Sequence, residues 1–259
     1  MKRPKYTVEM INNLIGVKES YNAPDKLLKI MFNKSQREQL MKDFLEVNPD
    51  VSYDWFSEYF QSELSRPSDK QDITPASLSN LMAKLSETKS PSNASHNNLD
   101  IGAGTGSLTI SKWNEDRLND CIFTYMPSNY FYECEEIDDR AIPFLIFNLA
   151  IRGMNAIIWH GNSLDRTCKG VIFIENAKDD FLSLSDVNVM PYNEEVKEQF
   201  NISEWSEQKY PNHIETEMGE WEYNVLEQRK KNYELFENFA NKFKIVAEHQ
   251  RKQAKAKAK

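Results

Sequence analysis

The stretch that determines the fold is Leu99-Asp-Ile-Gly-Ala-Gly-Thr-Gly106. An apolar run with an acid at its centre leads into three glycines at alternate positions, and Leu108, Ile110 and Trp113 then recur at helical spacing. Glycines let the backbone turn tightly and approach a ligand, and the next helix offers free amide groups. Gly-x-Gly-x-Gly differs from the dinucleotide fingerprint Gly-x-Gly-x-x-Gly. We therefore expect a strand, a turn and a helix, in which Asp100 would suit a cationic sulfonium ligand. A purely structural turn is the alternative.

Three apolar runs and one helical pattern follow this turn. Strands are expected at 130–137, 155–159 and 170–174, and an amphipathic helix at 140–153. The order strand, glycine turn, helix, strand, helix, strand is typical of an α/β protein with a parallel, doubly wound sheet. Four strands are evident and none after Asn193, so the expected sheet is short.

The segments on either side of this core have a different composition. Apolar residues at three-and-four spacing predict helices over about 24–48, 55–66 and 75–85, and a long helix from about residue 220. Residues 86–98 contain almost no apolar side chain and predict a loop. The expected organisation is a helical N-terminal region at 1–85, a loop at 86–98, a ligand-binding core at 99–192, and a polar, helical extension with a basic tail at 193–259.

The charge of the chain is unevenly distributed. The 259 residues include 32 Lys and Arg and 40 Asp and Glu, for a net charge of −8. From Arg229 onward there are 10 basic and 3 acidic residues, which leaves the rest of the chain at −15. The lysines of this tail predict either a solvated, frayed end or an arm that contacts DNA phosphates.

Several classes of protein are excluded by composition. No apolar run approaches the roughly 18 residues that a membrane span needs, and the N-terminus has no apolar secretory core. The three cysteines form no disulfide or zinc pattern, and the four histidines are too widely spaced to indicate a metal site. A cytoplasmic protein without a membrane partner is expected.

Two longer stretches, taken together with the glycine turn, resemble the motifs of a known protein family. Residues 132–164, YECEEIDDRAIPFLIFNLAIRGMNAIIWHGNSL, together with DIGAGTG at 100–106, resemble the modification subunits of type I restriction systems and related adenine-N6 DNA methyltransferases. Gln71-Asp-Ile-Thr-Pro75 is similar to the family's Phe-Tyr-Thr-Pro motif. Short chains of this kind resemble phage-encoded members. The resemblance implies a Rossmann-like, S-adenosylmethionine-dependent methyltransferase fold, with either a full or a truncated sheet.

The resemblance also implies roles for individual residues. Thr74 and Pro75 would border the methionine part of S-adenosylmethionine, and Glu136 would bind the ribose hydroxyls. Asn162 would replace an Asp that binds the adenine amino group, and its amide oxygen can still accept a hydrogen bond. The cofactor loop itself would consist of Asp100, Gly102, Gly104 and Gly106.

The family's catalytic motif, Asn-Pro-Pro-Phe/Tyr, is altered in this chain. The motif accepts hydrogen bonds from the amino group of a flipped adenine and stacks an aromatic ring on the base. Asn188-Val-Met-Pro-Tyr192 lies at about the right distance, but it lacks one proline and is one residue longer. Asn188, Pro191 and Tyr192 are therefore the candidate catalytic residues, with ordinary loop residues as the alternative.

Two functions from different classes follow. The first is a small adenine-N6 DNA methyltransferase that methylates a flipped adenine and needs a protein partner for target recognition. The second is a catalytically inactive, methyltransferase-like binding protein that engages a restriction, replication or host protein. Both predict that the chain binds S-adenosylmethionine.

Overall fold

The computed structural model describes residues 5–65, 96–120 and 125–216, together with residues 224, 226, 227 and 231. The chain divides into two compact units, Met1–Glu217 and Met218–Lys259, and the elements described here belong to the first. Its helices are α1 (Val8–Ile15), α2 (Ala23–Met31), α3 (Lys34–Val47), α4 (Ser57–Tyr59), α6 (Ser107–Asn119), α7 (Ile142–Ile151) and α8 (Glu194–Gln199). Its strands are β1 (His96–Ile101), β2 (Tyr130–Glu136), β3 (Ala156–Asn162), β4 (Thr167–Glu175), β5 (Asp186–Val189) and β6 (Glu204–Trp205).

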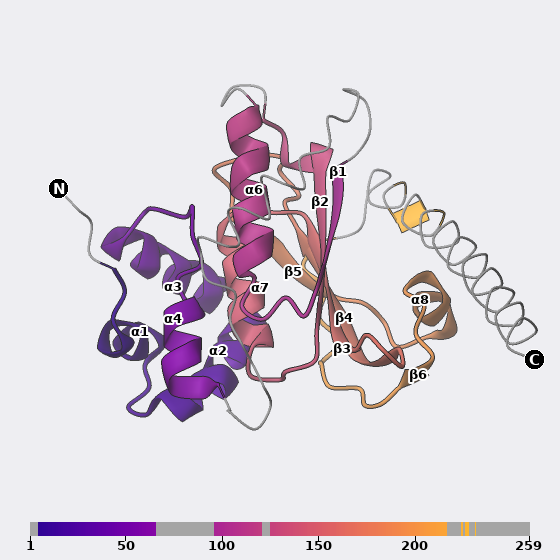
Figure 1. The fold of residues 1–259 in the computed structure, drawn as a ribbon, viewed down its shortest axis with the longest axis horizontal. Coiled ribbons are helices and arrows are strands. Elements are labelled where there is room, and N and C mark those ends of the chain that lie inside the picture. Colours follow the sequence, from indigo (N-terminus) through magenta and orange to yellow (C-terminus); the bar gives the residue numbers. More distant parts are fainter. Residues whose placement is uncertain are drawn as a thin grey trace, which may run out of the picture. The chain divides into compact units, whose positions relative to one another are not determined.

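The described strands form one mixed sheet in the order β1-β2-β3-β4-β5, and β6 pairs with β4. β1, β2 and β3 are parallel, whereas β4 is antiparallel to both β3 and β5. Helices α6 and α7 connect the parallel strands, and both connections step along the sheet in the same direction. Because such crossovers are right-handed, both helices lie on one face of the sheet, as Figure 1 shows.

The fold is thus α/β with a mixed, mostly parallel sheet. The parallel arrangement that the sequence predicts is confirmed for β1, β2 and β3 and is wrong for β4. The run 170–174 lies in β4, which is antiparallel to β3. Only four residues separate β3 from β4, and a parallel crossover needs a dozen or more. Two strands were not predicted: β5, and β6 beyond Asn193. Residues 96–98, expected in a loop, begin β1.

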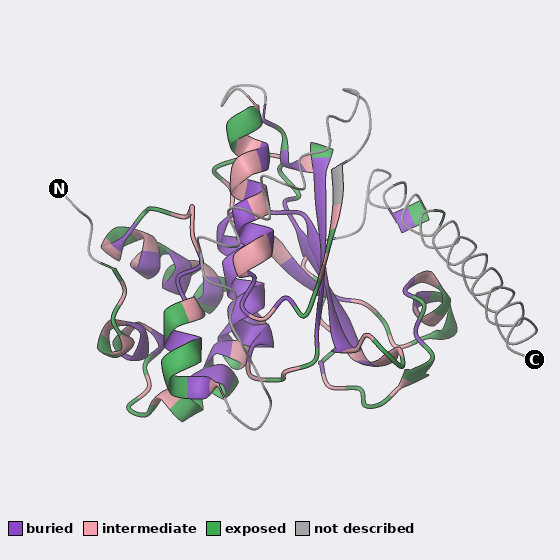
Figure 2. Ribbon diagram, viewed as in Figure 1, coloured by how far each residue is buried: buried purple, intermediate pink, exposed green. Residues whose placement is uncertain are grey.

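Helix α7 is the centre of the hydrophobic core. The sequence predicts an amphipathic helix, but all ten of its residues are buried (Figure 2). One side of α7 packs on the sheet and another on the N-terminal helices. The ring centroids of Phe147 and Phe44 of α3 lie 4.9 Å apart, and those of Phe144 and Phe56 also lie 4.9 Å apart. Burying each such ring contributes about 1.5–3 kcal/mol, so α7 joins the N-terminal helices and the sheet into one core.

The N-terminal region is helical, but its boundaries differ from those predicted. The expected helix over 24–48 is two helices, because Asn33 interrupts it and caps α3 by accepting a hydrogen bond from Gln36 N at 3.1 Å. The aromatic segment forms α4 and a π-helical turn, Phe60–Leu64. The helix predicted at 75–85 and the long C-terminal helix lie outside the described residues, apart from isolated positions.

Candidate functional site

The glycine turn between β1 and α6 has a left-handed backbone. Gly102, Gly104 and Gly106 have φ angles of 76°, 57° and 97°, where a side chain costs about 1–2 kcal/mol per residue. Gly102 N donates to Glu135 O of β2 at 2.8 Å. A Cβ on Gly106 would lie 2.9 Å from Leu145 Cδ1, whereas no atom of the described residues lies within 4 Å of a Cβ placed on Gly102 or Gly104. Gly106 is therefore constrained by packing, whereas the described residues leave space beside the Cα atoms of the other two glycines.

Glu136 lies at the end of β2 and faces this turn. Its Oε2 accepts a hydrogen bond from Gly104 N at 2.6 Å, and its Oε1 accepts from Ile137 N at 2.8 Å and Asp138 N at 2.7 Å. A carboxylate has about four acceptor positions, so about one remains for a ligand hydroxyl. The side chain is therefore fixed beside the turn.

Asp100 lies beneath the turn rather than in it. Its Oδ2 accepts a hydrogen bond from Thr109 Oγ1 of α6 at 2.7 Å. Burial raises the pKa of Asp100, and the bond from Thr109 opposes that shift. The observed role of Asp100 is to attach α6 to β1.

Asn162 ends β3 and forms a tight polar turn. Its Oδ1 accepts from Leu164 N at 3.0 Å, and its Nδ2 donates to Asp165 Oδ2 at 2.9 Å. Each group of this amide keeps one further acceptor or donor position. Asn162 is therefore held in place with capacity to bind a polar group.

The carboxyl ends of three parallel strands bring part of the predicted cofactor site together. The glycine turn follows β1, Glu136 ends β2 and Asn162 ends β3, so they span two strand spacings, or about 10 Å. Two large apolar side chains are exposed after the same strand ends: Ile137 is 56% exposed and Leu164 95%. Thr74 and Pro75 lie outside the described residues.

The predicted catalytic residues are not brought to this site. Asn188 belongs to β5, which lies at the far end of the strand order from β1, four spacings or about 19 Å away. Tyr192 Oη donates to Lys169 O at 2.9 Å and accepts from Tyr210 N at 3.0 Å, and Pro191 O accepts from Asn193 N. These contacts hold the segment after β5 against β4.

Asn188 instead anchors the last described segment of the first unit. Its Oδ1 accepts from Glu215 N at 2.7 Å and from Thr216 N at 3.1 Å. Arg37 of α3, 1% exposed, makes a bidentate ion pair with the Glu215 carboxylate at 2.8 and 2.5 Å. Although burial acts against it, this pairing lowers the pKa of Glu215. The pKa of Asp186 is lowered in the same way, against burial, by Lys34.

A buried polar network that the sequence did not reveal attaches the N-terminal helices to the glycine turn. Asp54, 8% exposed, accepts four hydrogen bonds. Its Oδ2 accepts from Thr105 Oγ1 at 2.5 Å and Ser107 Oγ at 2.6 Å, and its Oδ1 accepts from Asn148 Nδ2 at 2.8 Å and Phe56 N at 2.9 Å. The donors come from the turn, from α6, from α7 and from the chain before α4. Asp54 therefore fixes the turn relative to the N-terminal helices.

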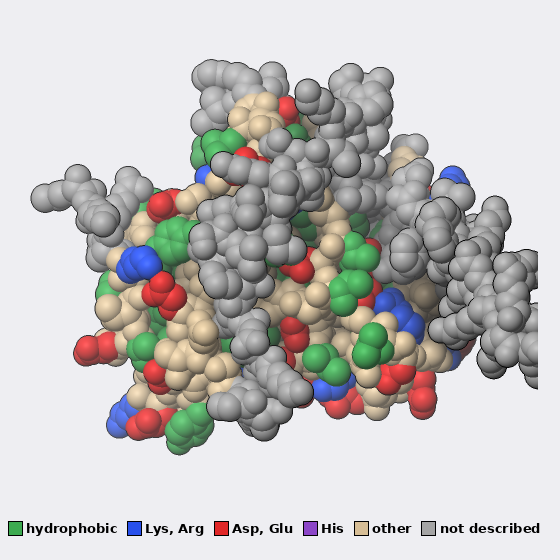
Figure 3. Space-filling view, viewed as in Figure 1, with side chains coloured by type: hydrophobic (Ala, Val, Ile, Leu, Met, Phe, Trp, Pro, Cys, Tyr) green, Lys and Arg blue, Asp and Glu red, His purple; other side chains and the backbone are tan. Residues whose placement is uncertain are grey.

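Metal, membrane and nucleic-acid partners receive no support from the described residues. Within these residues no group of three or more His, Cys, Asp or Glu side chains could hold a metal ion. No helix among them is long and apolar enough to cross a membrane. Cys134 and Cys168 are buried free thiols. On the described surface in Figure 3, acidic and basic side chains are interspersed. The basic arm from Arg229 lies almost wholly outside the described residues, so DNA and protein partners stay predictions.

Comparison of the sequence with protein-family models gives no match, and comparisons with curated proteins and with solved structures give none either.

Proposed function

We propose that this chain is a methyltransferase-like protein of Rossmann-like fold that binds S-adenosylmethionine at the glycine turn and Glu136. When bound, this cofactor supplies an activated methyl group. The observation that carries the proposal is the pairing of two glycines that face open space with a fixed carboxylate at the end of the neighbouring strand.

The side chains at the carboxyl ends of β1, β2 and β3 suit a nucleoside. The remaining acceptor position of Glu136 would take a ribose hydroxyl, and Gly102 and Gly104 would let the backbone approach the amino-acid end. The exposed side chains of Ile137 and Leu164 would cover the faces of a purine ring, and the Asn162 amide would bind its polar edge.

Geometry favours binding over catalysis as the function. Both lone pairs of Asn188 Oδ1 are taken by backbone amides, and the Tyr192 hydroxyl is bonded on both sides. The Asn188 oxygen therefore has no acceptor position left for the amino group of an adenine, and the Tyr192 side chain is held in place by its hydroxyl. The methyltransferase-like binding protein is therefore the better-supported of the two hypotheses.

Isothermal calorimetry with S-adenosylmethionine tests the proposal. Wild type should release heat on binding, and Glu136→Ala and Gly104→Ala should each weaken the affinity about tenfold or more. Gly16→Ala is the matched control, because Gly16 also has a left-handed φ, 79°, with no described atom within 4 Å of an added Cβ. It should carry the same backbone strain and leave affinity unchanged. A wild type that shows neither heat nor thermal shift contradicts the proposal.

Methyl transfer to DNA adenine is the second candidate, and one observation favours it. β5 runs in the same direction as β1, β2 and β3. The segment after Asn188 therefore leaves the sheet on the side of the strands' carboxyl ends, where the glycine turn also lies. Incorporation of labelled methyl groups into unmethylated DNA measures this activity. Transfer by the intact protein would establish catalysis, whereas binding without transfer at high enzyme concentration would leave the binding function alone.

A further inference from the structure

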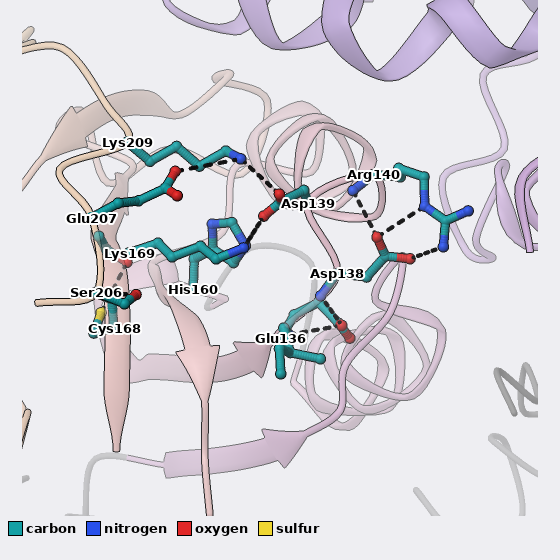
Figure 4. Close-up of polar contacts among 12 residues, drawn as sticks. Glu136, Asp138, Asp139, Arg140, His160, Cys168, Lys169, Ser206, Glu207 and Lys209 are labelled. Atoms are coloured by element: carbon teal, nitrogen blue, oxygen red, sulfur yellow. Dashed lines mark hydrogen bonds and ion pairs between the residues drawn. The ribbon is translucent and has the colours of Figure 1, made fainter. Parts of the chain in front are cut away.

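The loop between β2 and α7 is held by a carboxylate that contacts two lysines and a histidine. Asp139 Oδ1 lies 2.6 Å from Lys169 Nζ and 2.9 Å from His160 Nε2, and its Oδ2 lies 2.9 Å from Lys209 Nζ (Figure 4). These groups come from β4, from β3 and from the segment after β6. Lys169 Nζ donates a hydrogen bond to Asp139 Oδ1, whereas the His160 contact is close but poorly aligned for a hydrogen bond. Together His160 and the lysines, against partial burial, hold the pKa of Asp139 far below its usual range.

The three side chains that contact Asp139 are anchored in the fold. His160 is fully buried, and its Nδ1 lies 2.5 Å from Tyr210 Oη. Lys209 N donates to Lys169 O at 3.2 Å, which joins the segment after β6 to β4. These three partners are therefore fixed by the fold, and Asp139 brings the loop to them.

The same short loop contains Glu136. Two of the three hydrogen bonds to the Glu136 carboxylate come from the loop itself, from Ile137 N and Asp138 N. The third comes from Gly104 in the glycine turn. Any shift of the loop at Asp139 would therefore move the Glu136 carboxylate relative to Gly104. Arg140 and Asp138 pair with each other, with Nη2 2.8 Å from Oδ2, so they are not alternative partners for Asp139 (Figure 4).

We propose that Asp139 is a positioning residue for the glycine-turn site: its contacts with Lys169, Lys209 and His160 fix the loop so that Glu136 presents its carboxylate to Gly104 and to a ligand hydroxyl. The inference rests on the proposed function for its ligand. Its structural part, the placing of Glu136 against Gly104, stands independently of any ligand.

Amide hydrogen exchange on the ligand-free, full-length protein tests the structural part. In Asp139→Asn the amide of Gly104 should exchange about tenfold faster or more, because its acceptor is no longer held in place. Asp139→Glu keeps the charge and should restore most of the protection. The amide of Ile158 in β3 should be unchanged in both variants, which separates a local release from a loss of global stability. Glu58→Gln, which breaks the exposed Lys5–Glu58 pair, is the control.

Calorimetry with S-adenosylmethionine tests the consequence for binding. Asp139→Asn and the double variant Lys169→Met/Lys209→Met should both weaken binding about tenfold, because a displaced acceptor must be reordered when the ligand binds. The double variant also covers the case in which Asp139→Asn does not fold. Unchanged exchange at Gly104 in folded variants overturns the positioning role. If wild type binds no S-adenosylmethionine, the proposed function fails, and the exchange result by itself still decides whether Asp139 places Glu136.

Discussion

Replacing Asp54 by alanine should destabilise the first unit by about 2–6 kcal/mol. The hydroxyls of Thr105 and Ser107 can rotate toward other acceptors, but Phe56 N and one N–H of Asn148 cannot. The second Asn148 hydrogen is already bonded to Thr105 O at 2.7 Å. Two buried donors would thus lose their acceptor, at about 1–3 kcal/mol each.

Asp54→Asn should cost much less than Asp54→Ala. The amide oxygen of the new side chain can keep the bonds from Phe56 N and Asn148 Nδ2. Its NH₂ group can donate to the hydroxyl oxygens of Thr105 and Ser107, which accept as well as donate. The remaining cost is the difference between charge-assisted and neutral hydrogen bonds, about 1–2 kcal/mol in total.

Urea denaturation followed by circular dichroism measures both free energies of unfolding. Asp165→Ala is the control, because Asp165 also accepts several side-chain and backbone hydrogen bonds but is fully exposed, and its loss should have a much smaller effect. The reasoning is refuted if Asp54→Ala costs less than about 1 kcal/mol, or if Asp54→Asn is as damaging as Asp54→Ala.

Three further substitutions test the contacts that β4 and β5 make with the segments packed against them. Asn188→Ala should lower the free energy of unfolding by about 2–4 kcal/mol, because two half-buried amides lose their acceptor, and an unchanged urea midpoint would contradict this. The lowered pKa values of Glu215 and Asp186 mean that these groups stabilise the fold above their unfolded pKa values. Stability should therefore fall as the pH drops from about 5 to about 3, and Glu215→Gln should flatten that dependence. Gly170→Ala should cost about 1–3 kcal/mol, since its Cβ would lie 2.9 Å from Tyr210 Cε2, and a wild-type melting temperature would exclude the clash.

Local sequence was sufficient to predict the glycine turn and the elements around it. The stretch 99–113 has its own signals: an apolar run, three glycines and a helical pattern. The structure has a strand, a left-handed turn and α6 at these positions. Glu136 ends the next strand, as predicted. Turn geometry is a property of a few consecutive residues, so it can be read without knowing the rest of the fold.

The direction of β4 could also have been predicted. The runs 155–159 and 170–174 are separated by ten residues without a helical pattern. A parallel crossover needs more chain than that, so an antiparallel hairpin was the only connection that fits. The apolar composition of 170–174 is the same for a parallel and an antiparallel strand, so the length of the connection was the informative signal.

The contacts of Asp54 and Asp139 could not have been predicted. Asp54 bonds Asn148, 94 positions away, and Asp139 contacts Lys209, 70 positions away. Each of these acids looks like an ordinary surface residue in the sequence. Their roles depend on which segments the completed sheet brings together, and no local pattern records that.

The contrast between Glu136 and Asn188 shows how geometry separates a binding group from a structural one. Both polar residues were selected by their place in a motif, and both are buried in the structure. Glu136 uses about three of its four acceptor positions and faces a turn whose glycines have open space beside them. The Asn188 oxygen has two acceptor positions, and both are filled by the backbone of 215–216. A polar group can bind a ligand by hydrogen bonds only if it has capacity left over, and by that criterion Glu136 suits the proposed binding site whereas Asn188 holds the fold together.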